Sequence, residues 1–173
     1  ELDSGQLDRL MKVIFEEVPP PGRHGTMNKK FIGKNANVIL HEIGIEVGDE
    51  IRLVLAEVPN DHPLVWSEQM MPVFPLTRVW NVEDGIRLAK DSEHGFRHTA
   101  VIHSKNIDNM SRMARVMDCS IFVKNGPTQA GLGLGGEGFC SFTIASPTGE
   151  GMTNPRSFSR IRRCTLVDAF RIV

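Results

Sequence analysis

The sequence predicts an α/β fold, a mostly parallel sheet with crossover helices. Residues 99–103 have strand character, residues 106–117 carry apolar side chains at helical spacing, and residues 120–123 form a second buried strand pattern. Strands that alternate with helices are parallel, because the chain must cross back between them. A length of 173 residues with 40% hydrophobic and 24% charged residues fits an ordinary globular domain.

The N-terminal part predicts two helices. An apolar stripe at three- and four-residue steps indicates an amphipathic helix, which the prolines at 19–21 end; its residues are Leu7, Leu10, Met11, Ile14, Phe15 and Val18. Asn35 is placed to cap a short second helix, and Gly44 to stop it in a left-handed conformation.

The middle of the chain predicts strands at residues 51–55 and 73–79, since both are rich in β-branched or large apolar residues. Pro75 removes a backbone donor, which moves the second strand towards a sheet edge or a bulge. Asn81 followed by two acids predicts the start of a further helix, with Gly95 beyond its end.

Residues 125–154 are rich in glycine and contain Gly131-Leu132-Gly133-Leu134-Gly135-Gly136, a formal G-x-G-x-x-G motif. Such a motif cradles phosphate when it joins a strand directly to a helix. Here a linker precedes it and strand-like sequence follows it, so a close-packed loop is favoured over a phosphate cradle. The tail at residues 163–173 has strand character and could pair with another element or subunit.

Charge and composition argue against several partners. Lys and Arg number 20 against 21 for Asp and Glu, so no general field attracts nucleic acid or an anionic membrane. No apolar run approaches the roughly 20 residues of a membrane span. Three widely spaced cysteines favour free thiols in a reducing, cytoplasmic compartment. The histidines lack paired spacing, so we expect no metal site.

Two residues are candidates for chemistry. His98 follows a helix stop at the entrance to a strand, where an imidazole with a pKa near neutrality could move protons, although a structural role is more common. Glu68 lies in a loop before a strand, where its carboxylate could accept hydrogen bonds from sugar hydroxyls or simply be solvated.

From Lys30 onward the sequence resembles the C-terminal part of CoA-acylating aldehyde dehydrogenases, especially the propionaldehyde and acetaldehyde dehydrogenases of bacterial microcompartments. The resemblance is carried by several long segments, which are residues 30–34 (KFIGK), 68–73 (EQMMPV), 95–100 (GFRHTA), 120–127 (SIFVKNGP), 135–139 (GGEGF) and 145–151 (ASPTGEG).

The resemblance implies a reaction in which an aldehyde, NAD and coenzyme A give acyl-CoA and NADH through a thioester on an enzyme cysteine. It implies that Glu68 holds the nicotinamide ribose and that His98 assists deprotonation of the CoA thiol or water. By the same similarity, Thr143 and Ile144 line the acyl pocket. The expected substrates are short aldehydes such as propionaldehyde or acetaldehyde.

One departure limits this expectation. The family's nucleophilic cysteine lies in a Pro-Cys-x-Ala-Glu type segment, which does not occur in this sequence, and the nucleotide-binding domain is also missing. Residues 1–173 are therefore expected to be the C-terminal portion of the catalytic domain, with a helix and linker (1–29), an α/β core and Gly-rich loop (30–154) and a terminal pairing strand (155–173). Because the chain begins with Glu1, we expect it to be cut from a longer protein. Because the cysteine segment and the nucleotide-binding domain are missing, we expect it to be inactive alone.

The resemblance also implies partners and a location. Other subunits of the same enzyme are expected at the terminal strand, and microcompartment shell proteins through a segment not present here. The expected location is the cytoplasm, in the lumen of a bacterial microcompartment. The competing hypothesis is a non-enzymatic α/β module that binds a nucleotide or a partner.

Overall fold

The computed structural model describes residues 1–138, 143–144 and 151–167. The chain divides into two units, Glu1–Gly95 and Phe96–Val173, and each is considered by itself. Several predictions lie outside the described residues: the strand pattern at residues 139–142 and at Ala145, the segment 146–150, and the end of the tail from Asp168.

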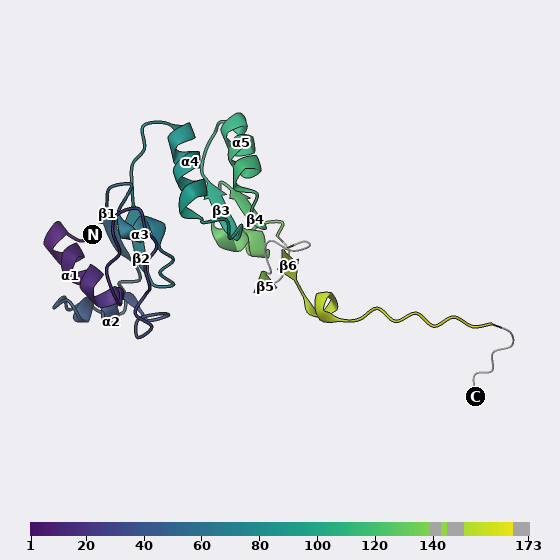
Figure 1. Cartoon of the computed structure of the whole chain (residues 1–173), viewed down its shortest axis with the longest axis horizontal. Helices are drawn as coiled ribbons and strands as arrows, with labels where there is room; N and C mark the ends of the chain where they lie inside the picture. The colour runs from purple at the N-terminus through teal and green to yellow at the C-terminus, as the bar shows by residue number, and fades with distance from the viewer. Residues whose placement is uncertain (139–142, 145–150, 168–173) are drawn as a thin grey trace. The chain divides into compact units, whose positions relative to one another are not determined.

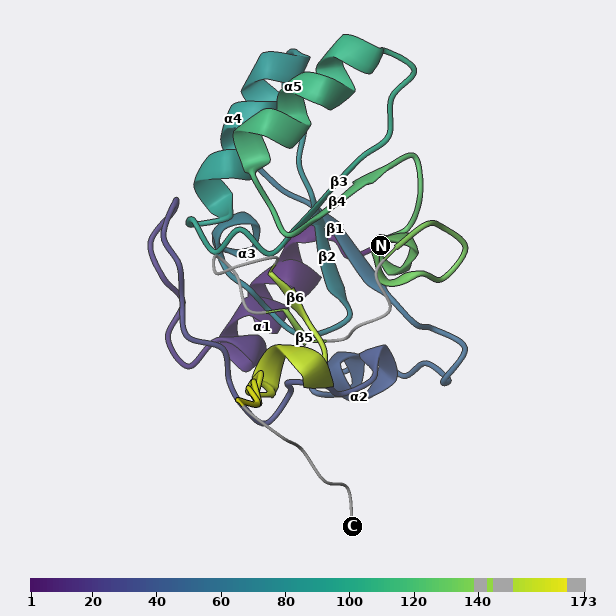
Figure 2. The ribbon, with the colours of Figure 1, turned by 90° about the vertical axis from the view of Figure 1, so that its right-hand side faces the viewer.

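The first unit is built on a parallel strand pair. Val54 pairs with Val73 and Glu57 with Leu76, and a helical turn lies in the crossover between the two strands. In Figures 1 and 2 the first helix lies beside this pair. The elements are α1 (Ser4–Ile14), α2 (Ala36–His41), β1 (Val54–Glu57), α3 (Pro63–Trp66), β2 (Val73–Leu76) and α4 (Val82–Ser92).

Helix α1 is shorter than its apolar stripe predicts. A capping box starts it, in which the Asp3 carboxylate accepts from the Gln6 amide at 2.8 Å and the Gln6 side chain accepts from the Asp3 amide at 2.9 Å. Phe15 leaves the helix in an extended conformation and forms an antiparallel bridge with Met27. The predicted extension to Val18 is therefore wrong, because backbone pairing replaces the last helical turn.

A hydrophobic core fills the first unit between helices and strands. Its buried residues come from α1, α2, α3, both strands, the linker between α1 and α2 and the turn after α2. They are Leu10, Met11, Ile14, Phe15, Met27, Phe31, Ala36, Ile39, Leu40, Ile43, Val54, Leu64 and Val73. Period-2 alternation puts Val54 and Ala56 inside and Glu57 outside.

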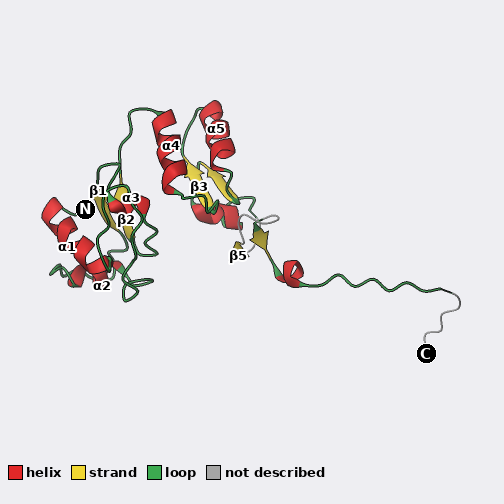
Figure 3. Cartoon of the chain, in the orientation of Figure 1, coloured by secondary structure: helices red, strands yellow, loops and turns green. Residues whose placement is uncertain are grey.

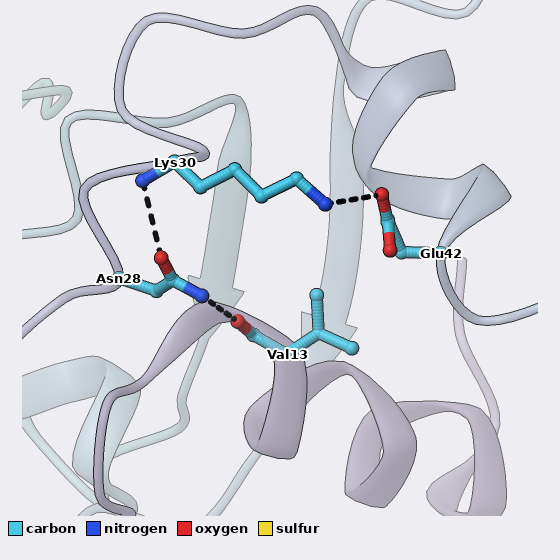
Figure 4. A network of polar contacts seen from close by, with 4 residues as sticks. All are labelled: Val13, Asn28, Lys30 and Glu42. Carbon is cyan, nitrogen blue, oxygen red and sulfur yellow. Dashed lines mark hydrogen bonds and ion pairs between the residues drawn. The ribbon is translucent and has the colours of Figure 1, made fainter.

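A polar network fixes the linker between α1 and α2 (Figure 4). The Asn28 side-chain amide donates to the Val13 carbonyl at 3.1 Å, and its oxygen accepts from the Lys30 backbone amide at 3.1 Å. Lys30 then reaches Glu42 with an Nζ–Oε1 distance of 2.9 Å. Asn28 thus joins the last turn of α1 to the linker that leads into α2.

The second unit repeats the strand–helix–strand arrangement. Thr99 to Ile102 pair in parallel with Ile121 to Lys124, and α5 contacts the first of these strands (Figure 3). A short antiparallel pair follows. The elements are β3 (Thr99–Ile102), α5 (Ile107–Met117), β4 (Ile121–Lys124), the 3-10 helix η1 (Thr128–Leu132), β5 (Thr143–Ile144), β6 (Met152–Thr153) and the 3-10 helix η2 (Pro155–Phe158).

The α/β prediction with parallel strands is confirmed, and so are α4, β3, α5 and β4 with small shifts at their ends. Asn81 caps α4 by accepting from the Asp84 amide at 2.9 Å, as its position predicts. The first strand begins three residues later than predicted, and β2 ends at Leu76 instead of residue 79. The described strands form three two-stranded sheets.

The described tail has no regular secondary structure at residues 161–167, so the terminal pairing strand stays a prediction. In the part of the chain that the structure covers, no helix is long and apolar enough to cross a membrane.

Candidate functional site

Glu68 lies between two anchored neighbours. The Ser67 hydroxyl, 7% exposed, accepts from the Gly25 amide at 2.9 Å across 42 residues of sequence. Gln69 follows, and its side-chain amide donates to the Leu64 carbonyl and, at 2.7 Å, to the Ser67 carbonyl. These bonds fix the backbone on both sides of Glu68.

The turn after Glu68 is also fastened. Met70 has a left-handed backbone with φ of 52°, and its carbonyl accepts from the Gly33 amide at 3.0 Å. Gly25, the partner of Ser67, is also closely packed: a Cβ at this position would lie 2.6 Å from Pro19 Cγ. The segment that presents Glu68 is therefore rigid, although the glutamate itself is exposed.

Within the described part of the chain, Glu68 makes no hydrogen bond or ion pair. A carboxylate carries two oxygens and about four acceptor positions, which suit a pair of neighbouring hydroxyls. An exposed carboxylate on an anchored segment therefore fits the ribose role that the family resemblance implies.

His98 lies directly before β3 in the second unit, and its side chain is exposed. Its Nδ1 is 2.7 Å from Thr99 Oγ1, and its carbonyl accepts from the Ile121 amide at 3.1 Å. When Nδ1 carries the proton and donates to Thr99, Nε2 holds the lone pair that can accept a proton. The contact with Thr99 restrains the imidazole ring at the entrance to β3.

The other two predicted site residues lie in the short antiparallel pair. Thr143 and Ile144 form β5, in register with Thr153 and Met152 of β6. Ile144 is half-buried and packs on the small core of the second unit, beside Ile121 and Val123. For Thr143 the structure gives the backbone alone, so the acyl-pocket role of both residues stays a prediction.

The structure places Glu68 in the first unit and His98 in the second. His98 contacts Thr99, while Ser67 and Gln69 anchor the chain on either side of Glu68. Sequence reasoning missed these contacts. Thr99 had a usable signal, since it is adjacent to the histidine, but the Gly25–Ser67 bond joins residues too distant for any local pattern.

Among the open pockets on the first unit, two lie near the ends of its strands. One, of about 410 Å³, borders the turn after Glu68 and is lined by Lys34, Arg52, Met70, Met71 and neighbours. The other, of about 440 Å³, lies at the carboxyl ends of β1 and β2. Sequence analysis missed both, because their residues come from separate loops.

An ion pair lies in the lining of the second pocket. Arg78 Nε lies 2.6 Å from Glu57 Oε1, and Arg78 Nη2 lies 3.0 Å from Oε2, a bidentate arrangement. The hydrogen bond from Arg78 lowers the pKa of the Glu57 carboxyl, and the same bond raises the pKa of Arg78. The sequence signal for this pair is an acidic residue at the end of one parallel strand and a basic residue just after the end of the other.

The Gly-rich motif forms a packed loop. η1 occupies its start, and Gly133 ends η1 with φ of 92°. A Cβ on Gly131 would collide with Ile121 of β4, and one on Gly138 with the Ala130 carbonyl. This packing supports the close-packed loop over the phosphate cradle.

Two of the three cysteines lie among the described residues. Cys119 Sγ donates to the Met117 carbonyl at 3.6 Å, and Cys164 is exposed in the tail. In the same part of the chain, no three His, Cys, Asp or Glu side chains are grouped so that they could hold a metal ion.

Comparison of the sequence with models of known protein families identifies the family of this chain. The model described as "Aldehyde dehydrogenase family" matches residues 52–139, which include Glu68, His98 and both parallel strand pairs. The chain belongs to the aldehyde dehydrogenase family. Its curated relatives include acetaldehyde dehydrogenase (acetylating) of Salmonella typhimurium, 51% identical over 173 residues, and propanal dehydrogenase (CoA-propanoylating) of the same organism, 44% identical over 172 residues. These alignments cover 100% and 99% of this chain but 37% and 36% of the relatives.

Solved structures agree with this family assignment. Propionaldehyde dehydrogenase of Rhodopseudomonas palustris with bound propionyl-CoA is 44% identical with a TM-score of 0.83, over 96% of this chain and 35% of that one. An engineered glycolyl-CoA reductase with bound NADP+ has the same identity and TM-score, over 96% and 36%. Propionaldehyde dehydrogenase from the Clostridium phytofermentans fucose utilisation bacterial microcompartment is 39% identical with a TM-score of 0.82, over 98% and 37%. The chain thus spans little more than a third of its relatives' length.

Proposed function

We propose that this chain forms part of the catalytic domain of a CoA-acylating aldehyde dehydrogenase. The proposed reaction converts a short aldehyde, NAD and coenzyme A into acyl-CoA, NADH and a proton. The observation that carries the proposal is 51% identity to an acetylating acetaldehyde dehydrogenase over every residue of the chain. The two anchored candidate residues support it.

Glu68 is proposed to hold the ribose next to the nicotinamide of NAD, which supplies the hydride acceptor when bound. Its carboxylate is exposed and unpaired within the described residues, while Ser67 and Gln69 hold the backbone around it. A carboxylate that is already oriented accepts both hydroxyls with little loss of backbone freedom.

His98 is proposed to take the proton from the CoA thiol as the thiol attacks an enzyme thioester. The step forms the new carbon–sulfur bond and expels the enzyme thiolate, while the proton passes to Nε2. Thr99 is proposed to support the required tautomer, in which its Oγ1, 2.7 Å away, accepts from Nδ1. The nucleophilic cysteine is proposed to belong to a part of the longer protein outside this sequence.

The test uses the whole polypeptide encoded by the gene that carries this sequence. NADH formation is followed by absorbance with acetaldehyde or propionaldehyde, with and without coenzyme A, and with NADP+ in place of NAD. We expect reduction that depends on both aldehyde and coenzyme A. Absence of reduction with every combination would overturn the proposal and favour the non-enzymatic module.

Site variants make the test specific. Glu68→Gln should raise KM for NAD and lower kcat, and His98→Ala should lower kcat for acyl transfer to CoA, each by about 10²-fold at most. Glu50→Gln and His103→Ala are matched controls, since both residues are exposed and His103 follows the other end of β3. Equal effects of the site and control variants would remove the assigned roles.

A further inference from the structure

The turn before β3 has an unusual backbone. His94, Gly95 and Arg97 all have left-handed φ values, of 59°, 80° and 55°. Across from this turn, Asp118 ends α5 with φ of 50°. Glycine, asparagine and aspartate tolerate this conformation, but arginine rarely adopts it. Arginine at position 97 is therefore not explained by the backbone alone.

A side-chain contact accounts for the arginine. Arg97 Nη1 lies 2.9 Å from Asp118 Oδ2, so the two left-handed residues are joined directly. Backbone bonds continue from the same point, because the Ser120 amide donates to the Arg97 carbonyl at 2.9 Å and the Ile121 amide donates to the His98 carbonyl at 3.1 Å. The ion pair thus stands at the first rung of the β3–β4 ladder, one residue from His98.

This ion pair contributes little to the folding stability of the chain. Its side chains are 47% and 67% exposed, and solvent screens a pair of that exposure strongly. Its geometric effect is more specific, since it restrains the backbone at Arg97, and that backbone sets the direction in which the His98 side chain leaves the chain.

We infer that Arg97 and Asp118 are positioning residues that orient the His98 imidazole for proton transfer. The inference rests on the acid–base role proposed for His98. Without the pair, Arg97 would sample ordinary right-handed or extended conformations, and the imidazole would lose its alignment with the reacting thiol. Small misalignments of reacting groups reduce rates strongly.

The test compares Asp118→Asn, His98→Ala and the double variant in the whole polypeptide. Asparagine keeps the shape of Asp118 and tolerates its left-handed backbone, while it removes the charge. We expect Asp118→Asn to lower kcat by about ten-fold with KM for NAD and the melting temperature unchanged. In the His98→Ala background the same substitution should cause no further loss, because the pair acts through His98.

Controls separate the possible failures. Asp118→Glu should restore part of the rate, and Glu42→Gln, which removes another exposed ion pair of 2.9 Å, should leave it unchanged. Full activity of Asp118→Asn, or a loss that persists undiminished without His98, would overturn the positioning role alone. Full activity of His98→Ala would instead overturn the role of His98, and the inference with it.

Discussion

Thr99 is the residue beside the imidazole whose hydroxyl can accept from a protonated Nδ1 of His98. Its Oγ1 lies 2.7 Å from Nδ1, and only an Nδ1–H tautomer leaves the lone pair on Nε2. Thr99→Val keeps the β-branched shape in β3 but removes the acceptor. We expect a kcat loss of about ten-fold in the whole polypeptide, measured by steady-state NADH formation. Thr99→Ser should retain most of the rate; equal losses in both variants would contradict this mechanism.

Glu57 makes a pH-dependent contribution to stability. The hydrogen bond from Arg78 lowers its pKa from the ordinary 4.5, so the folded chain favours the charged carboxylate. The stabilisation is complete above the unfolded-state pKa and is lost as pH falls through the lower folded pKa. Urea midpoints of wild type and Glu57→Gln should therefore differ at neutral pH and converge in acid. Glu50→Gln serves as control, and a difference that grows on acidification would contradict the assignment.

Ser67 joins stability to the presentation of Glu68. Its hydroxyl is the buried acceptor for the Gly25 amide, so Ser67→Ala leaves that donor unsatisfied at a cost of about 1–3 kcal/mol. We expect a lower urea midpoint and, in the whole polypeptide, a higher KM for NAD with a smaller change in kcat. Ser159→Ala, an exposed serine in the tail, is the control. An unchanged KM for NAD would show that the Ser67–Gly25 hydrogen bond does not affect how Glu68 binds the cofactor.

At the scale of elements, helix α2 offers a matched pair of substitutions. Ile39 is fully buried in the first core, while its neighbour Val38 is 43% exposed. Ile39→Ala should destabilise the chain by about 2–5 kcal/mol, since it removes buried methyl groups and leaves a cavity. Val38→Ala should stay within about 0.5 kcal/mol. Chemical denaturation measures both, and comparable losses would show that α2 does not pack as described.

Elements with local signals were predictable, and those set by distant contacts were not. The cap at Asn81 predicted the start of α4, and the helical spacing of apolar residues over 106–117 predicted α5. The end of α1 depends on the Phe15–Met27 bridge, which no local pattern contains. The start of β1 at Val54 is likewise set by its pairing with Val73, not by the apolar run before it.

At the scale of the whole molecule, the site itself was predictable only in part. Glu68 and His98 were predicted because they lie in long segments that resemble a family. The residues that hold them, Ser67 and Asp118, carry no sequence signal of their own. Ser67 acts through a residue 42 positions away, and Asp118 through one 21 positions away. Anchors of this kind are properties of the folded chain.

We expect the nucleophile of the complete protein to lie outside this chain. Cys119 follows a helix end and donates its thiol to a backbone carbonyl, and none of the three cysteines lies in the family's cysteine motif. Replacing Cys119, Cys140 and Cys164 together by serine should therefore leave the dehydrogenase activity of the whole polypeptide within a few-fold of wild type. The 173-residue chain alone should form no NADH. If the triple variant were inactive but folded, single replacements would identify a nucleophile inside this chain, and the proposed division of the active site would be wrong.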